Sequence, residues 1–260
     1  INSMNGMDDR DFGIEVDFFV PCFVDQLYPE AAFAAVKVLE ALGCRVHCPS
    51  GQTCCGQPAY NAGFWEEAKP VVCKWLHDFA PAKDGEPRSV VVLSSSCTGM
   101  IRNAYGDLLS ADGTTVSEWQ AIRPRVYEWV EFVQAHPRFK DLKFRFPHKV
   151  SYHDACSALR ECGIQSQVRD LLNQVQGLHL IELPDRETCC GFGGTFAVKF
   201  EGISTAMADQ KLQHYATTGA EYLISADLSC LMHLQAYADR QGSGVRSLHI
   251  AQVLAQGLQA

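Results

Sequence analysis

Thr53-Cys54-Cys55-Gly56 in the first half of the chain recurs as Thr188-Cys189-Cys190-Gly191 in the second half. A single cysteine precedes each of these steps and another follows it. Within the 260 residues, the second arrangement follows the first at a nearly constant offset of about 134 positions, which indicates an internal duplication. The two repeated sets are Cys22, Cys54, Cys55 and Cys97, and Cys156, Cys189, Cys190 and Cys230.

Short apolar runs rich in β-branched residues end just before the single cysteines and predict buried strands. A further strand is expected within 39–48 and within 171–183, after a helix end and a glycine. Because helical stretches alternate with these strands, we expect parallel sheets with right-handed crossover connections. The other predicted strands are 16–20, 89–93, 149–152 and 222–225, and the predicted helices are 28–42, 64–80, 126–135, 164–175, 203–218 and 248–256.

The duplication also predicts the domain organisation. We expect an α/β fold of two tandem pseudo-repeats, residues 14–137 and 148–258. Each repeat should be a small parallel sheet with helices on both faces and cysteine-bearing loops at the carboxyl-terminal edge of the strands. The segment 138–148 contains Lys, Arg and Pro residues and is the expected linker. Residues 110–124 are expected to form a loose segment within the first repeat.

The cysteine pattern predicts two metal sites. In a parallel sheet all strand-to-helix loops lie at one edge, so the four cysteines of each repeat can converge. Four thiolates are the ligands of a [4Fe-4S] cluster, and we expect one or two such clusters. Zinc also accepts four thiolates and stays open as an alternative, mainly in the first repeat, although the sequence has no Cys-x2-Cys step. Free cysteines are often buried simply as small apolar residues, but this would not explain why two sets of four cysteines recur at the same spacing.

Composition limits the classes of partner. The formal net charge of -8 provides no broad basic surface, which argues against nucleic acid and anionic membranes. No apolar run approaches the roughly 20 residues of a transmembrane helix, and the first residues lack the features of a signal peptide. We therefore expect a cytoplasmic protein. In that compartment, twelve cysteines indicate metal ligands or redox thiols rather than a disulfide framework.

Other residues near the repeated cysteines have weaker interpretations. His153 lies three positions before Cys156, where its imidazole can donate a hydrogen bond to cluster sulfur or cap the next turn. The remaining four cysteines have no counterpart in the other repeat, and we expect them in the core or on the surface. They are Cys44, Cys48, Cys73 and Cys162.

Four segments together resemble a known family. The chain from 16 to 258 resembles the cysteine-rich "CCG" domain proteins, which include the B subunit of heterodisulfide reductase and the iron-sulfur subunit of glycolate oxidase. The similarity is strongest to the lactate utilization protein A family. The segments that carry it are 54–61 (CCGQPAYN), 96–100 (SCTGM), 189–196 (CCGFGGTF) and 230–232 (CLM).

The resemblance implies a function. It implies a cytoplasmic component of a three-protein system that oxidises L-lactate to pyruvate, in which this chain relays electrons through iron-sulfur centres. No catalytic residue is assigned. The ferredoxin-like Cys-x2-Cys-x2-Cys run of glycolate oxidase subunits is missing here, so electrons should arrive from another subunit. Gly191-Phe192-Gly193-Gly194 lacks the spacing of a dinucleotide-binding loop.

Two alternatives differ in class from an electron relay. One is a zinc-bearing scaffold subunit that holds partner enzymes together. The other is a thiol-disulfide enzyme like heterodisulfide reductase, whose relatives carry a fifth cysteine in each motif. Here those positions hold Met100 and His233, which argues against non-cubane clusters and against disulfide reduction. His233 could still be an unusual ligand or a hydrogen-bond donor to the cluster.

Overall fold

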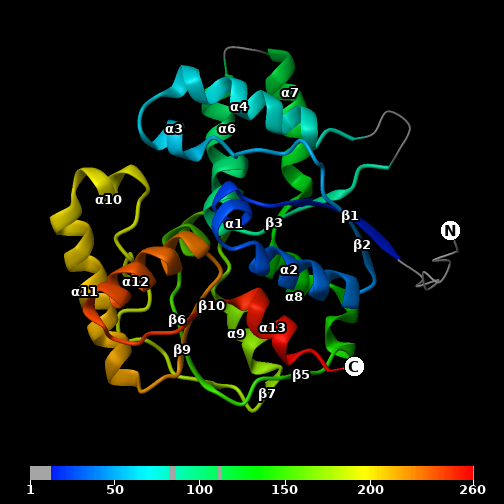
Figure 1. Cartoon of the computed structure of the whole chain (residues 1–260). Coiled ribbons are helices and arrows are strands. Elements are labelled where there is room, and N and C mark those ends of the chain that lie inside the picture. Colours follow the sequence, from blue (N-terminus) through cyan, green and yellow to red (C-terminus); the bar gives the residue numbers. More distant parts are fainter. Residues whose placement is uncertain (1–12, 82–85, 111–112, 260) are drawn as a thin grey trace, which may run out of the picture.

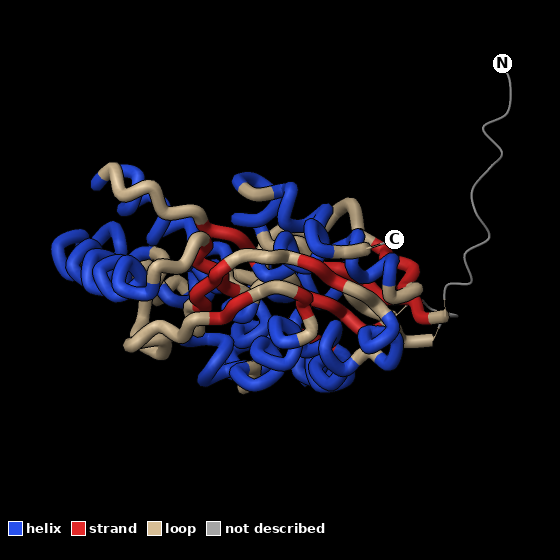
Figure 2. The backbone as a smooth tube through the Cα atoms, turned by 90° about the horizontal axis from the view of Figure 1, so that it is seen from below, coloured by secondary structure: helices blue, strands red, loops and turns tan. Residues whose placement is uncertain are grey.

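Two four-stranded parallel sheets form the centres of the two repeats (Figures 1 and 2). The computed structural model describes residues 13–81, 86–110 and 113–259. The first sheet has the order β2-β1-β3-β4 and the second the order β10-β9-β6-β8, so β1, β2, β3 and β4 correspond to β6, β8, β9 and β10. The strands are β1 Ile14–Phe19, β2 Cys44–His47, β3 Ser89–Val92, β4 Val126–Glu128, β6 Lys149–Tyr152, β8 His179–Leu180, β9 Tyr222–Ser225 and β10 Ser247–His249.

The predicted α/β class with tandem pseudo-repeats is confirmed. The central strands are apolar along most of their length because helices cover both faces of each sheet. Phe18 and Phe19, for example, are successive residues of β1 that point to opposite faces, and both are fully buried. None of the helices in the described residues is long and apolar enough to cross a membrane.

Helices and short helical turns connect the strands. In the first repeat they are α1 Cys22–Leu27, α2 Pro29–Ala41, α3 Gln57–Asn61, α4 Trp65–Asp78, α5 Ser95–Gly99, η1 Met100–Ala104, α6 Tyr105–Leu109, α7 Gly113–Ile122, η2 Arg123–Arg125, α8 Trp129–Ala135 and η3 Pro137–Asp141. In the second repeat they are η4 Ala158–Cys162, α9 Gln165–Asn173, α10 Thr195–Lys199, α11 Glu201–Thr218, α12 Leu228–Gln241 and α13 Ile250–Gly257. Six of them, α2, α4, α8, α9, α11 and α13, lie where the apolar periodicity predicts helices, within a few residues at each end, whereas α12 and the short helical segments were not predicted.

The structure corrects two of the predicted segments. Within the segment expected to be loose, α7 is a regular helix, whose Trp119 is buried and donates its indole N–H to the carbonyl oxygen of Ile101 at 2.7 Å. The predicted closing helices begin later than expected, because their first residues form β4 and β10. Each of these strands has only three residues, too few to show a strand period in the sequence.

One buried cluster, around Trp75 and Phe79, belongs to the first repeat alone, whereas the larger hydrophobic core is shared by both repeats. It contains residues from both sheets, such as Phe18 and Val150, together with Trp129 of α8 and Leu171 of α9. The last helix of each repeat packs on the first long helix of the other, α13 on α2 and α8 on α9. Within the expected linker, β5 Phe144–Arg145 pairs in parallel with β7 Val175–Gln176. The repeats are therefore packed against each other over their helices and not merely joined by a linker.

Candidate metal centre

The strand order brings the cysteines of the first repeat to one edge of its sheet. Strands β1 and β3 are neighbours, and the chain leaves them in opposite directions toward β2 and β4. Cys22 begins α1 after β1, Cys97 lies in α5 after β3, and Cys54-Cys55 lie in the loop after β2. This carboxyl-terminal edge, where the connections diverge, is the usual position of a binding site in such sheets.

The second repeat places its cysteines in the same way. Cys156 follows β6, Cys230 lies in the first turn of α12 after β9, and Cys189-Cys190 follow β8. Among the described residues no two cysteines form a disulfide. Of the eight predicted ligands, Cys55, Cys97, Cys190 and Cys230 are buried and the others are partly buried.

The thiols of each set interact directly. In the first repeat the sulfur atoms of Cys22 and Cys54 are 3.7 Å apart, and those of Cys55 and Cys97 are 3.2 Å apart. The thiol of Cys22 donates to Cys54 and lowers the pKa of Cys54 to about 3. In the second repeat the thiol of Cys156 lowers the pKa of Cys189 to about 2 in the same way. Each set thus favours one thiolate whose negative charge is stabilised by neighbouring thiols.

The glycine after each cysteine pair shapes the loop. Gly56 and Gly191 have φ values of +83° and +92°, which disfavour a side chain. Their backbone N–H groups each donate to the sulfur of the first cysteine of the pair, at 3.4 Å in both repeats. A Cβ atom on Gly191 would lie 2.6 Å from the carbonyl oxygen of Ser204, whereas one on Gly56 would meet its nearest neighbour at 3.4 Å. Because these glycines have no side chain, the loop that carries each cysteine pair can pack directly on a helix, α4 in the first repeat and α11 in the second.

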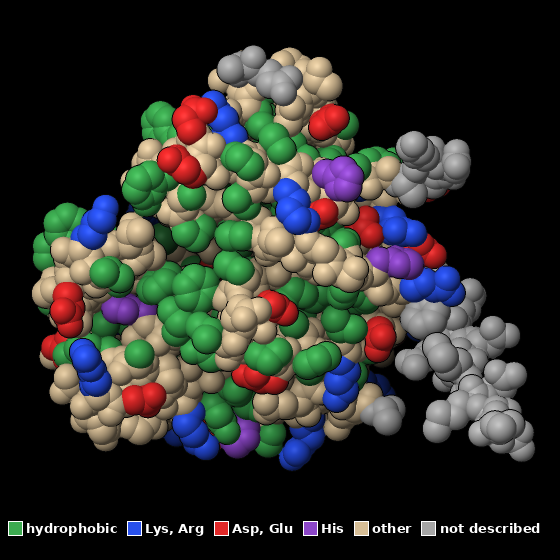
Figure 3. Space-filling model, turned by 45° about the horizontal axis from the view of Figure 1, so that its top comes forward, with side chains coloured by type: hydrophobic (Ala, Val, Ile, Leu, Met, Phe, Trp, Pro, Cys, Tyr) green, Lys and Arg blue, Asp and Glu red, His purple; other side chains and the backbone are tan. Residues whose placement is uncertain are grey.

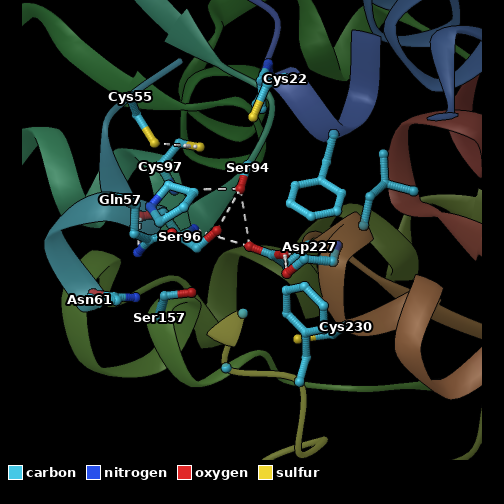
Figure 4. A pocket seen from close by; sticks show the side chains of 18 of the residues that line it. Cys22, Cys55, Gln57, Asn61, Ser94, Ser96, Cys97, Ser157, Asp227 and Cys230 are labelled. Atoms are coloured by element: carbon cyan, nitrogen blue, oxygen red, sulfur yellow. Dashed lines mark hydrogen bonds between the residues drawn. The ribbon is translucent and has the colours of Figure 1, made fainter. Parts of the chain in front are cut away.

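Both sets of cysteines line a single cavity of about 520 Å³ (Figure 4). The sequence predicts two sites, but it does not predict that they line the same cavity. The relative position of the two repeats depends on packing between helices, and these helices lie outside the cysteine motifs. Figure 3 shows one face of the molecule, with hydrophobic side chains gathered across its middle. Val198 of α10, which is 83% exposed, also lines the cavity.

Ser94 and Asp227 join the two sets of cysteines. They occupy equivalent positions, three residues before Cys97 and Cys230, and each caps the helix that carries its cysteine. The Ser94 hydroxyl donates to Oδ2 of Asp227 at 3.1 Å, and the backbone N–H of Ser96 donates to the same oxygen at 3.0 Å (Figure 4). Sequence reasoning did not identify this pair: the shared spacing from the cysteines shows that the two positions are equivalent, but not that the two side chains meet.

His153 is completely buried, and within the part of the chain that the structure describes neither of its ring nitrogens has a hydrogen-bond partner. One of these nitrogens and the sulfur atoms of Cys190 and Cys230 all lie within 4.8 Å of one another. Burial, followed by the positive charge of Lys211, lowers the pKa of His153 to about 4, so the imidazole is neutral at neutral pH. The structure thus brings this residue to the second set of cysteines.

His233, the other predicted histidine, does not line the cavity. Its Nε2 atom is 3.2 Å from the hydroxyl oxygen of Ser204, and it packs behind Gly191 rather than lining the cavity. The position equivalent in the first motif, Met100, is buried. Neither residue supplies a further thiol to the site.

The four unrepeated cysteines lie apart from the cavity. Cys44 is buried in β2, with its sulfur 3.8 Å from Nε2 of His136. Cys162 is partly buried and donates to the carbonyl oxygen of Ser95 at 3.4 Å. Cys48 and Cys73 are exposed. None of these four lines the cavity that the repeated cysteines share.

The two sets suit a metal bound by thiolates. If all four cysteines of a repeat were ionised, their closely spaced negative charges would repel one another. A bound cation would compensate this repulsion. The glycine N–H groups point at sulfur, and the unpartnered imidazole of His153 lies beside two of the thiols. Cysteine sulfur binds both iron-sulfur clusters and zinc, so the donor set specifies a soft metal centre rather than one particular metal.

Comparison with known proteins agrees with this description. The cysteine-rich domain named CCG matches the chain twice, over residues 16–102 and 150–235. The fold and the paired motifs therefore define a protein with two CCG cysteine-rich domains.

Curated relatives specify the family more closely. Lactate utilization protein A of Halalkalibacterium halodurans is 39% identical over 93% of this chain and 96% of its own length. Lactate utilization protein A 1 of Bacillus anthracis is 36% identical over 94% of this chain and 99% of its own length. The chain belongs to the lactate utilization protein A family.

One solved structure shares the fold. It is a hypothetical protein from Helicobacter pylori with a TM-score of 0.58 and 13% sequence identity. The similarity covers 94% of this chain and 49% of that one. At this identity the similarity concerns the fold alone.

Proposed function

We propose that this protein is an iron-sulfur electron-transfer component of a cytoplasmic, multi-component system that oxidises L-lactate or a related 2-hydroxy acid. The observation that carries this proposal is the cavity lined by both sets of four cysteines. The names of the relatives support the connection with lactate utilization. The two matches to the CCG domain, over residues 16–102 and 150–235, support two centres in one molecule, and we take the two repeats to extend over 14–137 and 148–258.

The repeated cysteines are the proposed ligands of these centres. One [4Fe-4S] cluster would be held by Cys22, Cys54, Cys55 and Cys97, and another by Cys156, Cys189, Cys190 and Cys230. When bound there, a cluster of this type would supply one-electron transfer. The protein contributes a partly buried site, the N–H groups of Gly56 and Gly191 that donate to sulfur, and ligands on helices with fixed positions.

The shared cavity supports exchange of electrons between the two centres. The hydrogen bond between Ser94 and Asp227 joins the N-cap residues of two helices, α5, which contains Cys97, and α12, which contains Cys230. Because the sequence has no ferredoxin-like cysteine run and no dinucleotide fingerprint, the electron donor and the acceptor are proposed to be separate subunits. In this proposal the chain relays electrons and does not act on the hydroxy acid itself.

Metal and sulfide analysis of anaerobically purified protein tests this proposal. We expect about four iron atoms and as many acid-labile sulfides for each filled site, with broad visible absorbance. Cys54→Ser and Cys189→Ser should each reduce the iron content, whereas Cys48→Ser, which removes an exposed cysteine outside the cavity, should retain it. Stoichiometric zinc without sulfide would contradict the proposal and support a scaffold role.

A further inference from the structure

The two repeats differ at a buried position just before the first cysteine. Phe19 and His153 each lie three residues before that cysteine, Phe19 as the last residue of β1 and His153 directly after the equivalent strand β6. Phe19 pairs with Val92 of β3. The backbone N–H of His153 donates to the carbonyl oxygen of Ile224 in β9 at 2.8 Å. The two side chains therefore occupy the same place in the two sheets.

A second difference lies on the helix behind the glycine loop. A Cβ on Gly56 would approach the carbonyl oxygen of Ala68, and a Cβ on Gly191 would approach that of Ser204, so these two helix positions correspond. Seven residues further along each helix lie Trp75 and Lys211. An aromatic residue in the first repeat is thus replaced by a buried lysine in the second.

In the first repeat these two positions form an apolar cluster. The ring of Phe19 contacts the ring of Trp75 edge-on, with centroids 5.9 Å apart, and also that of Phe79, at 5.5 Å. In the second repeat, His153 and Lys211 are both fully buried. Lys211 has partners, because its ammonium group donates to the carbonyl oxygen of Asp185 at 2.5 Å and lies 3.5 Å from the Asp185 carboxylate. The ring of His153 has none among the described residues.

A buried imidazole without a partner is unusual, since nearly all buried polar groups are hydrogen-bonded. The sulfur atoms of Cys190 and Cys230 lie within 4.8 Å of one ring nitrogen of His153 and of each other. The charged groups near the ring are Lys211 and the acidic groups Cys189, Asp227 and Asp185. Of these, Lys211 is held by Asp185. The His153 imidazole is therefore placed to donate a hydrogen bond to a sulfur atom of the metal centre once that centre is bound.

We propose that His153 donates its unpartnered imidazole N–H to a sulfur of the centre held by the second repeat, and thereby raises the reduction potential of that centre. Reduction adds negative charge to the cluster sulfurs, so a hydrogen bond to sulfur stabilises the reduced form. The first repeat has at this position Phe19, whose side chain has no N–H group. This inference rests on the proposed function, because it requires an iron-sulfur centre. His153 is a positioning residue and not an iron ligand, since four thiolates complete the ligand set.

Redox titration followed by EPR tests the assignment. His153→Phe places in the second repeat the residue that the first repeat has, and His153→Gln retains an N–H donor. We expect both variants to retain iron and sulfide. In His153→Phe one centre should shift to a more negative potential while the other stays unchanged, and His153→Gln should shift less. Phe19→Leu, the control in the first repeat, should leave the second centre unchanged.

A measurement on the wild-type protein avoids dependence on the folding of a variant. Protein labelled with ¹⁵N-histidine should show weak ¹⁵N coupling to one reduced centre by pulsed EPR. A strong coupling typical of an Fe–N bond, or loss of iron in both His153 variants, would overturn the donor role in favour of ligation.

Absence of coupling, or an unshifted potential in iron-loaded His153→Phe, would overturn this inference alone. Wild-type protein without iron and sulfide would overturn the proposed function together with it.

Discussion

At the scale of single residues, Gly191 shows how tightly the backbone packs behind the second set of cysteines. Its positive φ and the nearby carbonyl oxygen of Ser204 leave no room for a side chain. The equivalent Gly56 has the same conformation but more space. Two glycines in identical motifs therefore differ in how strictly the structure requires them.

We predict that Gly191→Ala lowers the free energy of unfolding of the metal-free protein by about 1–3 kcal/mol, because it combines backbone strain with a steric clash. Gly56→Ala should cost less. Gly202→Ala is the matched control, since Gly202 is exposed in α11 with nothing near its Cβ position, and alanine there should stabilise by about 0.5–1 kcal/mol. Urea denaturation measures all three. Equal losses for Gly191→Ala and Gly56→Ala would contradict the packing described.

Glu128 gives the protein a pH dependence of its own. It caps α8, is fully buried, and accepts a hydrogen bond from Ser95. Burial raises the pKa of Glu128 to about 8, above that of the unfolded chain, so the folded state holds a proton that the unfolded state has lost. Its contribution to stability is complete below the unfolded pKa and declines as the pH rises toward 8.

We therefore predict that the free energy of unfolding of the wild-type protein falls by about 1–2 kcal/mol relative to that of Glu128→Gln between about pH 6.5 and 8. The amide introduced by this substitution stays neutral throughout, so the difference between the two proteins isolates this one group from the titration of the cysteines. Urea denaturation of the metal-free proteins across this range measures it. Parallel curves for the two proteins would show that Glu128 is ionised in the folded state.

At the scale of elements, the sequence was most informative where a strand or helix carried a long apolar pattern. The strands β1, β3, β6 and β9 and the long helices α2, α4, α9 and α11 were predicted on that basis. The short strands β4 and β10 were missed because three residues show no period. The helix α7 was missed because Gly113-Thr114-Thr115 at its start resembles a loop.

The cysteine loops show the same division between local and long-range information. Their place at the carboxyl edge of a parallel sheet followed from the strand–loop–helix order alone. The Ser94–Asp227 contact and the single cavity did not, because they depend on how α2 packs on α13 and α8 on α9. Motif spacing within one repeat contains no information about packing between repeats.

At the scale of the whole molecule, the shared core makes each repeat dependent on the other. Apolar residues of the first repeat, such as Phe18 and Trp129, belong to the same buried cluster as Val150 and Leu171 of the second. Separating the repeats would expose this surface to water, at roughly 25 cal/mol for each Å². We expect the repeats to fold as one cooperative unit.

A fragment of residues 14–137 should therefore lack a cooperative thermal transition, whereas the full chain should show a single one. Circular dichroism and calorimetry under reducing conditions compare the two. The reciprocal fragment, 148–258, provides a second test of the same dependence. Independent cooperative unfolding of either fragment would contradict a shared core.

The central claim is that each set of four cysteines binds its own iron-sulfur centre on the wall of one cavity. EPR of the reduced, anaerobic protein, with Cys54→Ser and Cys189→Ser compared with the wild type, tests it most directly. We predict two distinguishable signals in the wild type, of which Cys54→Ser removes or alters one and Cys189→Ser the other. Signals that are unaffected by both substitutions, or no iron-based signal in iron-reconstituted wild-type protein, would contradict the claim.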